Sequence, residues 1–79
     1  MKTVLITGAN RGIGLATSKL LRKKKYNIIG VARSKVKNFP GKFFECDLSN
    51  TNEIELLIKK LKKLDVTCIV NNAGASFGQ

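Results

Sequence analysis

Three glycines near the N-terminus, Gly8, Gly12 and Gly14, have the spacing that a phosphate site can use. They follow residues 4–6, a β-branched and aliphatic run typical of a buried strand, and a helical pattern opens after them. Glycines let the backbone approach an anion closely, and the first N–H groups of a helix have no partner within it. The segment therefore predicts a phosphate site. Its spacing, G-x-x-x-G-x-G, differs from the common G-x-G-x-x-G fingerprint, and a similar turn can also serve as a plain connection.

A second motif, Asn71-Asn72-Ala73-Gly74, follows the apolar run at residues 68–70, about sixty residues downstream of the first. Together, T-G-x-x-x-G-I-G and N-N-A-G resemble the motifs of the short-chain dehydrogenase/reductase family. The resemblance extends from Lys2 to Gly74 and covers the first third of a typical family member. It implies a cofactor-binding part of an oxidoreductase that uses a nicotinamide dinucleotide.

The resemblance also assigns roles to individual residues. The three glycines would admit the cofactor pyrophosphate, and Asn10, Arg11 and Ile13 would line the turn. Asp47 and Leu48 would lie near the adenine. The asparagines of N-N-A-G would be scaffold residues that tie the fourth strand to its neighbours, and Ala73 and Gly74 would run alongside the nicotinamide ribose. The candidate cofactor-binding residues are Gly8, Asn10, Arg11, Gly12, Ile13, Gly14, Arg33, Asp47, Leu48, Asn71, Ala73 and Gly74. Asp47 could instead belong only to the cap of the following helix.

The residues after the second predicted strand favour NADP over NAD. Dinucleotide folds select NAD with an acidic residue that binds the ribose hydroxyls. Here Ala32 stands near that position, and Arg33 follows it. The planar guanidinium of Arg33 could pair with a 2′-phosphate, and Arg11 adds positive charge on the same side. Arg33 could alternatively be an ordinary solvated loop residue.

The catalytic residues of the family cannot be placed in this chain. The family uses a serine and a Y-x-x-x-K motif, in which the tyrosine is the general acid/base. Tyr26 is the only tyrosine, and Gly30 stands four positions after it. We therefore predict no catalytic residue and no turnover by this chain alone.

The alternation of elements predicts an α/β fold with a parallel sheet. The resemblance implies that this sheet is a partial Rossmann-like, doubly wound sheet with the strand order 3-2-1-4. The expected strands are residues 3–6, 28–31, 42–46 and 68–70, and the first helix covers residues 13–24 and ends near Asn27. The connection between the second and third strands is too short and broken for a full helix, since it contains Asn38-Phe39-Pro40-Gly41. Asn50 or Ser49 should cap the last helix, with Glu53 close to a capping box. The faces expected to pack on the sheet are Ile13, Ala16, Leu20 and Leu21 in the first helix, and Ile54, Leu57, Ile58, Leu61 and Leu64 in the last.

Composition limits the remaining possibilities. The chain has 79 residues, fifteen cationic and five acidic side chains, and a net charge of +10. This charge could indicate a nucleic-acid or anionic-surface partner, but lysines in the last turn of a helix also suit the helix dipole, and interleaved aromatic residues are missing. Nucleic acid is therefore an unlikely main partner. Without histidine or a C-x-x-C motif, Cys46 and Cys68 do not indicate a metal site, and we expect both to be reduced, buried side chains.

Several readings stay open. The leading one is a single truncated NAD(P)-binding domain over residues 1–79, shortened by gene decay, a premature stop or deliberate cutting. A stand-alone nucleotide-binding module and half of a split enzyme, completed by a second polypeptide at the fourth strand, are the alternatives. No apolar run is long enough to span a membrane, and the first strand begins too close to Met1 for a signal peptide, so we expect a cytoplasmic protein.

Overall fold

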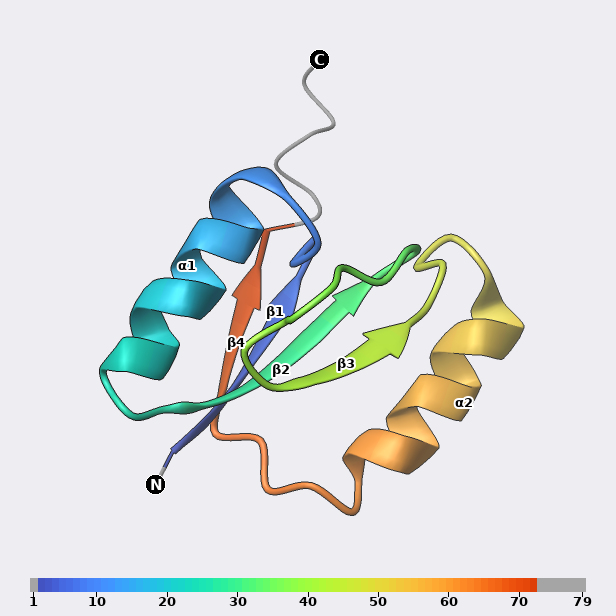
Figure 1. The fold of residues 1–79 in the computed structure, drawn as a ribbon. Helices are drawn as coiled ribbons and strands as arrows, with labels where there is room; N and C mark the ends of the chain where they lie inside the picture. The colour runs from blue at the N-terminus through green and yellow to red at the C-terminus, as the bar shows by residue number, and fades with distance from the viewer. Residues whose placement is uncertain (1, 73–79) are drawn as a thin grey trace.

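The structure, a computed structural model, describes residues 2–72 and consists of a parallel sheet with a helix on each face (Figure 1). Its elements in chain order are β1 (Thr3–Thr7), α1 (Gly12–Lys23), β2 (Asn27–Ala32), β3 (Lys42–Glu45), α2 (Thr51–Leu61) and β4 (Cys68–Asn71). The strand order is β3-β2-β1-β4, which confirms the predicted topology. No helix in the described part of the chain is long and apolar enough to cross a membrane.

Alternate residues of the two central strands supply two separate cores. Leu5 and Ile29 face α2 and pack with Leu57, whereas Val4 and Ile28 face α1. The pattern follows from the geometry of a strand, in which successive side chains point to opposite faces. Because β1 and β2 are covered on both faces, their central residues 4–6 and 28–32 carry no polar side chain, as expected for a parallel sheet.

The connection between β2 and β3, residues 33–41, contains no helix, as predicted. Phe39 covers this part of the sheet instead of a helix. Its ring packs edge-on against Phe43, with ring centroids 4.9 Å apart. The two rings lie over Gly30, where an added Cβ atom would come within 2.5 Å of Phe39 Cζ. A glycine in β2 therefore makes room for an aromatic side chain in place of a crossover helix.

The predicted packing face of α1 is wrong. Ile13 and Leu20 are 76% and 54% exposed, and Ala16 is also exposed. The buried positions are Gly14 and Ser18, with Leu21 partly buried. Small residues let α1 lie close to the sheet, so the contact is made mainly by Gly14 and Ser18 with Leu21 beside them, whereas Ile13 and Leu20 point outward.

Four smaller predictions are also corrected. Helix α1 ends before Lys25, which has a positive φ of 71°, and Asn27 already belongs to β2. Ile58 of α2 is 47% exposed, although its helical neighbours pack as expected. Cys68 lies exposed on the edge strand β4, whereas Cys46 is buried. Asn50 does cap α2, but Glu53 does not complete a capping box; its side chain accepts from the backbone N–H of Asp47.

Substitution of Phe39 tests its replacement of the crossover helix. Because Phe39 is partly buried, Phe39→Ala should lower the free energy of unfolding by about 2 kcal/mol, below the range for fully buried phenylalanines. Leu20→Ala is the control, with an expected change within about 0.5 kcal/mol because its side chain is exposed. Urea denaturation measures both. A larger loss for Leu20→Ala than for Phe39→Ala would contradict this account of the α1 face.

Candidate functional site

The carboxyl ends of all four strands meet at one edge of the sheet, where the predicted site residues lie. Thr7 pairs with Val31 and with Asn71, and Ala32 pairs with Glu45, so the strands end at similar heights. The glycine turn, Arg33, Asp47 and Asn72 follow these ends directly. Ligands of open α/β sheets bind at this edge, next to the point where the strand order reverses. That point lies between β1 and β4.

The turn between β1 and α1 depends on glycine at three positions. Gly8 and Gly12 have positive φ angles of 63° and 58°, which side-chain-bearing residues rarely adopt. Gly14 is needed for a different reason. A Cβ atom there would lie 2.2 Å from the carbonyl oxygen of Gly8 and 2.8 Å from Nδ2 of Asn72. At Gly12, by contrast, an added Cβ atom would meet nothing within 4 Å, so this glycine borders open space.

The N-terminus of α1 is suited to an anion. Its N-cap residue, Arg11, makes no side-chain cap hydrogen bond, and the first turn contains no acidic residue. The first N–H groups of the helix thus have no side-chain partner from the cap, and the helix dipole adds partial positive charge. Arg11 and Ile13 are exposed beside this end, and Asn10 is partly buried within the turn.

Two asparagines join β4 to the glycine turn. Asn71 Oδ1 accepts a hydrogen bond of 3.1 Å from the hydroxyl of Thr7. Asn72 Nδ2 donates to the carbonyl oxygen of Gly8 at 3.2 Å. Both bonds link segments 64 positions apart in the sequence. The two side chains therefore hold the ends of neighbouring strands together, which is a positioning role.

Asp47 is held in the loop after β3 by its neighbours. Its Oδ1 accepts hydrogen bonds from the hydroxyl and the backbone N–H of Ser49, at 2.6 and 2.9 Å, and its own N–H donates to Glu53 Oε1. The hydrogen bonds from Ser49, together with the nearby charge of Arg33, lower the pKa of Asp47. The adjacent Cys46 shows the opposite effect, since burial and the charges of Glu53 and Asp47 raise the pKa of its thiol. Leu48, the other residue predicted near the adenine, is 39% exposed.

The structure thus places most of the predicted site residues along one edge of the sheet. Arg33 is exposed next to Asp47, and Ala32 before it is buried. Ala73 and Gly74 lie outside the described residues. The roles of Ser49 and Glu53 in fixing Asp47 were missed from the sequence. Ser49 follows two positions after the aspartate, a spacing at which an Asx turn forms, so this contact had a recognisable signal.

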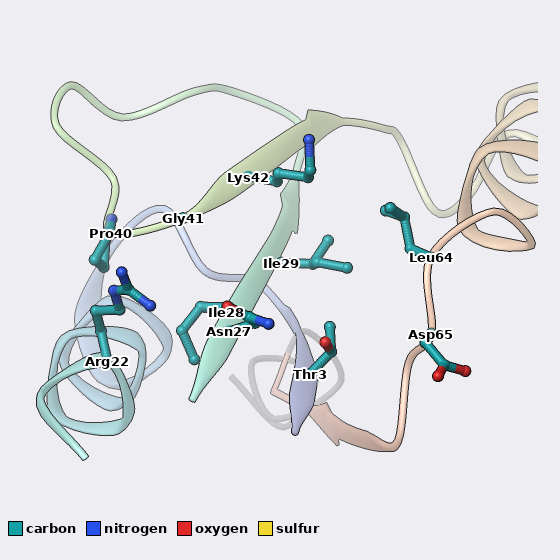
Figure 2. A pocket seen from close by; sticks show the side chains of 10 residues that line it. All are labelled: Thr3, Arg22, Asn27, Ile28, Ile29, Pro40, Gly41, Lys42, Leu64 and Asp65. Atoms are coloured by element: carbon teal, nitrogen blue, oxygen red, sulfur yellow. The ribbon is translucent and has the colours of Figure 1, made fainter. Parts of the chain in front are cut away.

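The hollow shown in Figure 2 lies at the opposite edge of the sheet. Its volume is about 620 Å³, and it extends around the amino ends of β1, β2 and β3. Ile28 and Ile29 contribute to its lining, and the guanidinium of Arg22 already donates to the carbonyl oxygen of Tyr26 at 3.3 Å. None of the predicted cofactor residues lines it. This hollow is therefore separate from the candidate site.

Comparison with known proteins identifies the fold. The family model described as short chain dehydrogenase matches residues 2–79. The chain belongs to the short-chain dehydrogenase/reductase family. It is 40% identical over 81 aligned residues to a 3-oxoacyl-[acyl-carrier-protein] reductase of Rickettsia prowazekii and 34% identical over 88 to dehydrogenase/reductase SDR family member 11 of Gallus gallus. Each alignment covers 92% of this chain.

Solved structures of the short-chain dehydrogenase/reductase family have the same fold as this chain. Aldohexose dehydrogenase of Thermoplasma acidophilum superimposes with a TM-score of 0.82 and 26% identity over 90% of this chain and 29% of that one. A 4-hydroxyisoleucine dehydrogenase complexed with NADH gives 0.79 and 32% over 87% of this chain and 31% of the other. The chain spans about a third of the curated relatives it matches: 33% of the Rickettsia reductase and 34% of the Gallus protein. It corresponds to the NAD(P)-binding Rossmann region of these oxidoreductases.

The hydrogen bonds that Asp47 accepts from Ser49 can be tested through the pKa of the Asp47 carboxyl. Because the folded-state pKa of Asp47 is lowered, its ionised form stabilises the fold above the unfolded pKa, and this contribution is lost as the pH falls through the folded pKa. Ser49→Ala should raise the pKa of Asp47 toward its ordinary value, whereas Ser49→Thr, which keeps a hydroxyl, should change it less. NMR titration of the Asp47 carboxyl carbon measures both. An unchanged pKa in Ser49→Ala would show that these hydrogen bonds are not its cause.

Proposed function

We propose that residues 1–79 form one NADP-binding domain of a short-chain oxidoreductase and that the site lies at the carboxyl edge of its sheet. The observation that carries the proposal is the close contact of Gly14 with Gly8, beside the uncapped N-terminus of α1. This contact brings a helix N-terminus to the end of β1, where N–H groups can bind a pyrophosphate. Open space at Gly12 leaves room for it.

The other site residues have proposed roles along the same edge. Asn10, Arg11 and Ile13 line the pyrophosphate turn, and Asp47 with Leu48 binds the adenine. Asn71 holds the end of β4 against β1 through its hydrogen bond with Thr7. By the family resemblance, Ala73 and Gly74, which lie outside the described residues, would contact the nicotinamide ribose. A bound nicotinamide would supply or accept a hydride. The site residues named here position the cofactor and take no part in proton transfer.

The preference for NADP rests on charge. Arg33 is exposed immediately after β2, where a family member selective for NAD would have an acidic residue, and Ala32 has no polar side chain to bind a ribose hydroxyl. Arginine binds phosphate through a planar fork of N–H donors. Arg11 is also exposed, at the N-cap of α1, and contributes a second positive charge to the same edge.

Charge reversal at Arg33 tests the preference for NADP. Arg33→Asp should weaken NADP⁺ binding by about 10- to 100-fold, because the loss of one charge-assisted hydrogen bond changes the dissociation constant by about that factor. NAD⁺, which has no 2′-phosphate, should be affected less. Lys35→Asp is a matched control, because it makes the same charge change two positions away in the same exposed loop. Calorimetric titration measures both cofactors. Equal affinities of the unmodified chain for NADP⁺ and NAD⁺ would overturn the assignment.

Carbonyl reduction needs a proton donor that this chain does not provide. Tyr26, the only tyrosine, is partly buried in the core on the α1 side and precedes β2, so it lies at the amino edge, away from the candidate site. General acid–base catalysis is typically worth about 10²- to 10⁴-fold in rate. We expect no NADPH oxidation that depends on an added ketone. Such turnover by the purified chain, surviving removal of trace host reductases, would contradict the proposal, whereas activity only with a second polypeptide would favour a split enzyme.

A further part of the proposal concerns β4, which lies at the edge of the sheet and pairs with β1 on one side. An edge strand presents N–H and C=O groups that another strand can use. Ile69 in its centre is 63% exposed. We therefore propose that β4 is where this chain associates with itself or with a complementing polypeptide.

This association should respond to a charge on β4. Sedimentation velocity should show an apparent mass that rises with concentration, and Ile69→Lys should reduce that rise. Leu56→Lys is the control, because Leu56 is similarly exposed, at 58%, but lies on α2. A chain that stays monomeric at all concentrations, or equal effects of the two substitutions, would argue against β4 as the interface.

A further inference from the structure

The positive charge of the chain is concentrated at the amino edge of the sheet, opposite the candidate site. In this fold the helices end where the strands begin, so α1 and α2 deliver their basic last turns to the same edge (Figure 1). We call this surface the basic edge. It comprises nine exposed cationic residues: Lys2, Arg22, Lys23, Lys24, Lys25, Lys42, Lys59, Lys62 and Lys63.

The acidic residues are distributed differently. Of the five acidic residues, Asp65 lies near the basic edge, in the loop before β4. Glu45 and Asp47 lie toward the carboxyl edge, and Glu53 and Glu55 lie in the first half of α2. Lys60 is not counted in the basic edge, because its ammonium lies over the ring of Phe44, 5.7 Å from the centroid. The helix dipole favours cations in the last turn of each helix, and the fold brings both helix ends to the same edge. The result is a surface of positive potential that attracts an anionic partner.

The side chains around the basic edge indicate which anionic partner fits. Exposed aliphatic residues lie next to both lysine clusters: Leu20, 54% exposed, stands one turn before Lys23 and Lys24, and Ile58, 47% exposed, stands one turn before Lys62. Clusters of lysine are attracted to the anionic headgroups of phospholipids, and exposed aliphatic side chains beside such clusters can add apolar contact with the bilayer.

Features that would favour nucleic acid are weaker at the basic edge. Binding of single strands uses exposed aromatic side chains on which bases stack. Tyr26, the aromatic residue between α1 and β2, is partly buried in the core. Arg22 is the only arginine of the basic edge, and its guanidinium donates to Tyr26. The remaining cations are lysines, which act as point charges without a planar fork.

We propose that the basic edge binds the surface of an anionic phospholipid bilayer. The lysines of α1 and α2 contact the headgroups, and Leu20 and Ile58 add apolar contact. The carboxyl edge, with the candidate cofactor site, then faces away from the membrane. This proposal depends on the placement of charge and not on cofactor binding, so either can fail without the other.

Flotation with lipid vesicles tests the proposal. The 79-residue chain should bind vesicles of phosphatidylcholine containing about a third phosphatidylserine, should not bind pure phosphatidylcholine, and should be released by salt. The double substitution Lys24→Gln and Lys63→Gln should lower the partition coefficient about 30-fold, from the usual contribution of a lysine near an anionic surface.

The matched control is Lys35→Gln with Lys37→Gln, which removes the same charge from the exposed connection that leaves the carboxyl end of β2. It should lower binding much less. Equal losses in the two variants would show that only net charge matters and would overturn the proposal, as would the absence of vesicle binding. Tighter binding to duplex RNA than to the vesicles, with the same dependence on Lys24 and Lys63, would assign the basic edge to nucleic acid instead. Circular dichroism of each variant verifies that the fold is retained.

Discussion

The structure depends on the close approach of α1 to the end of β1 at Gly14. An added Cβ atom would lie 2.2 Å from the carbonyl oxygen of Gly8, so no other residue fits without movement of the backbone. The same carbonyl accepts the hydrogen bond from Asn72, and the buried hydroxyl of Ser18 donates to the carbonyl of Gly14. One contact therefore fixes β1, α1 and the end of β4 relative to one another. The candidate site follows from this arrangement, because it sets the helix N-terminus beside the switch point of the sheet.

Topology was predictable because it depends on patterns that extend over many residues. Alternating apolar runs and helical periods predicted a parallel sheet, and the family resemblance carried by the glycine turn and N-N-A-G implied the order 3-2-1-4 that the structure shows. The face of α1 was not predictable from apolar spacing, since the residues in contact are Gly14 and Ser18, and no hydrophobicity pattern marks a small residue as buried. Cys68 was misjudged although the predicted order already placed β4 at the edge of the sheet, because apolar residues on a strand were expected to be buried and those of an edge strand are less covered than those of a central one.

The site was predictable where a backbone requirement selects a residue type and less so where side chains interact. Positive φ angles explain Gly8 and Gly12. The hydrogen bond from Asp47 to Glu53, in contrast, joins two exposed polar residues six positions apart. Such a contact depends on how the loop after β3 meets α2, which local sequence does not specify. The fold does not specify the choice between NADP and NAD either, because the contact that we propose between Arg33 and a 2′-phosphate is made by a side chain.

The most direct test of the central claim is a titration of the ¹⁵N-labelled chain with NADP⁺, followed through its backbone amide resonances at moderate salt. Binding at the carboxyl edge predicts saturable shifts in residues 8–14, in Arg33 and around Asp47, with little change at Lys24 and Lys63. Shifts confined to Lys24, Lys63 and their neighbours, and lost as salt is raised, would show that the cofactor is held only as an anion by the basic edge. That result would contradict the assignment of the glycine turn as the cofactor site.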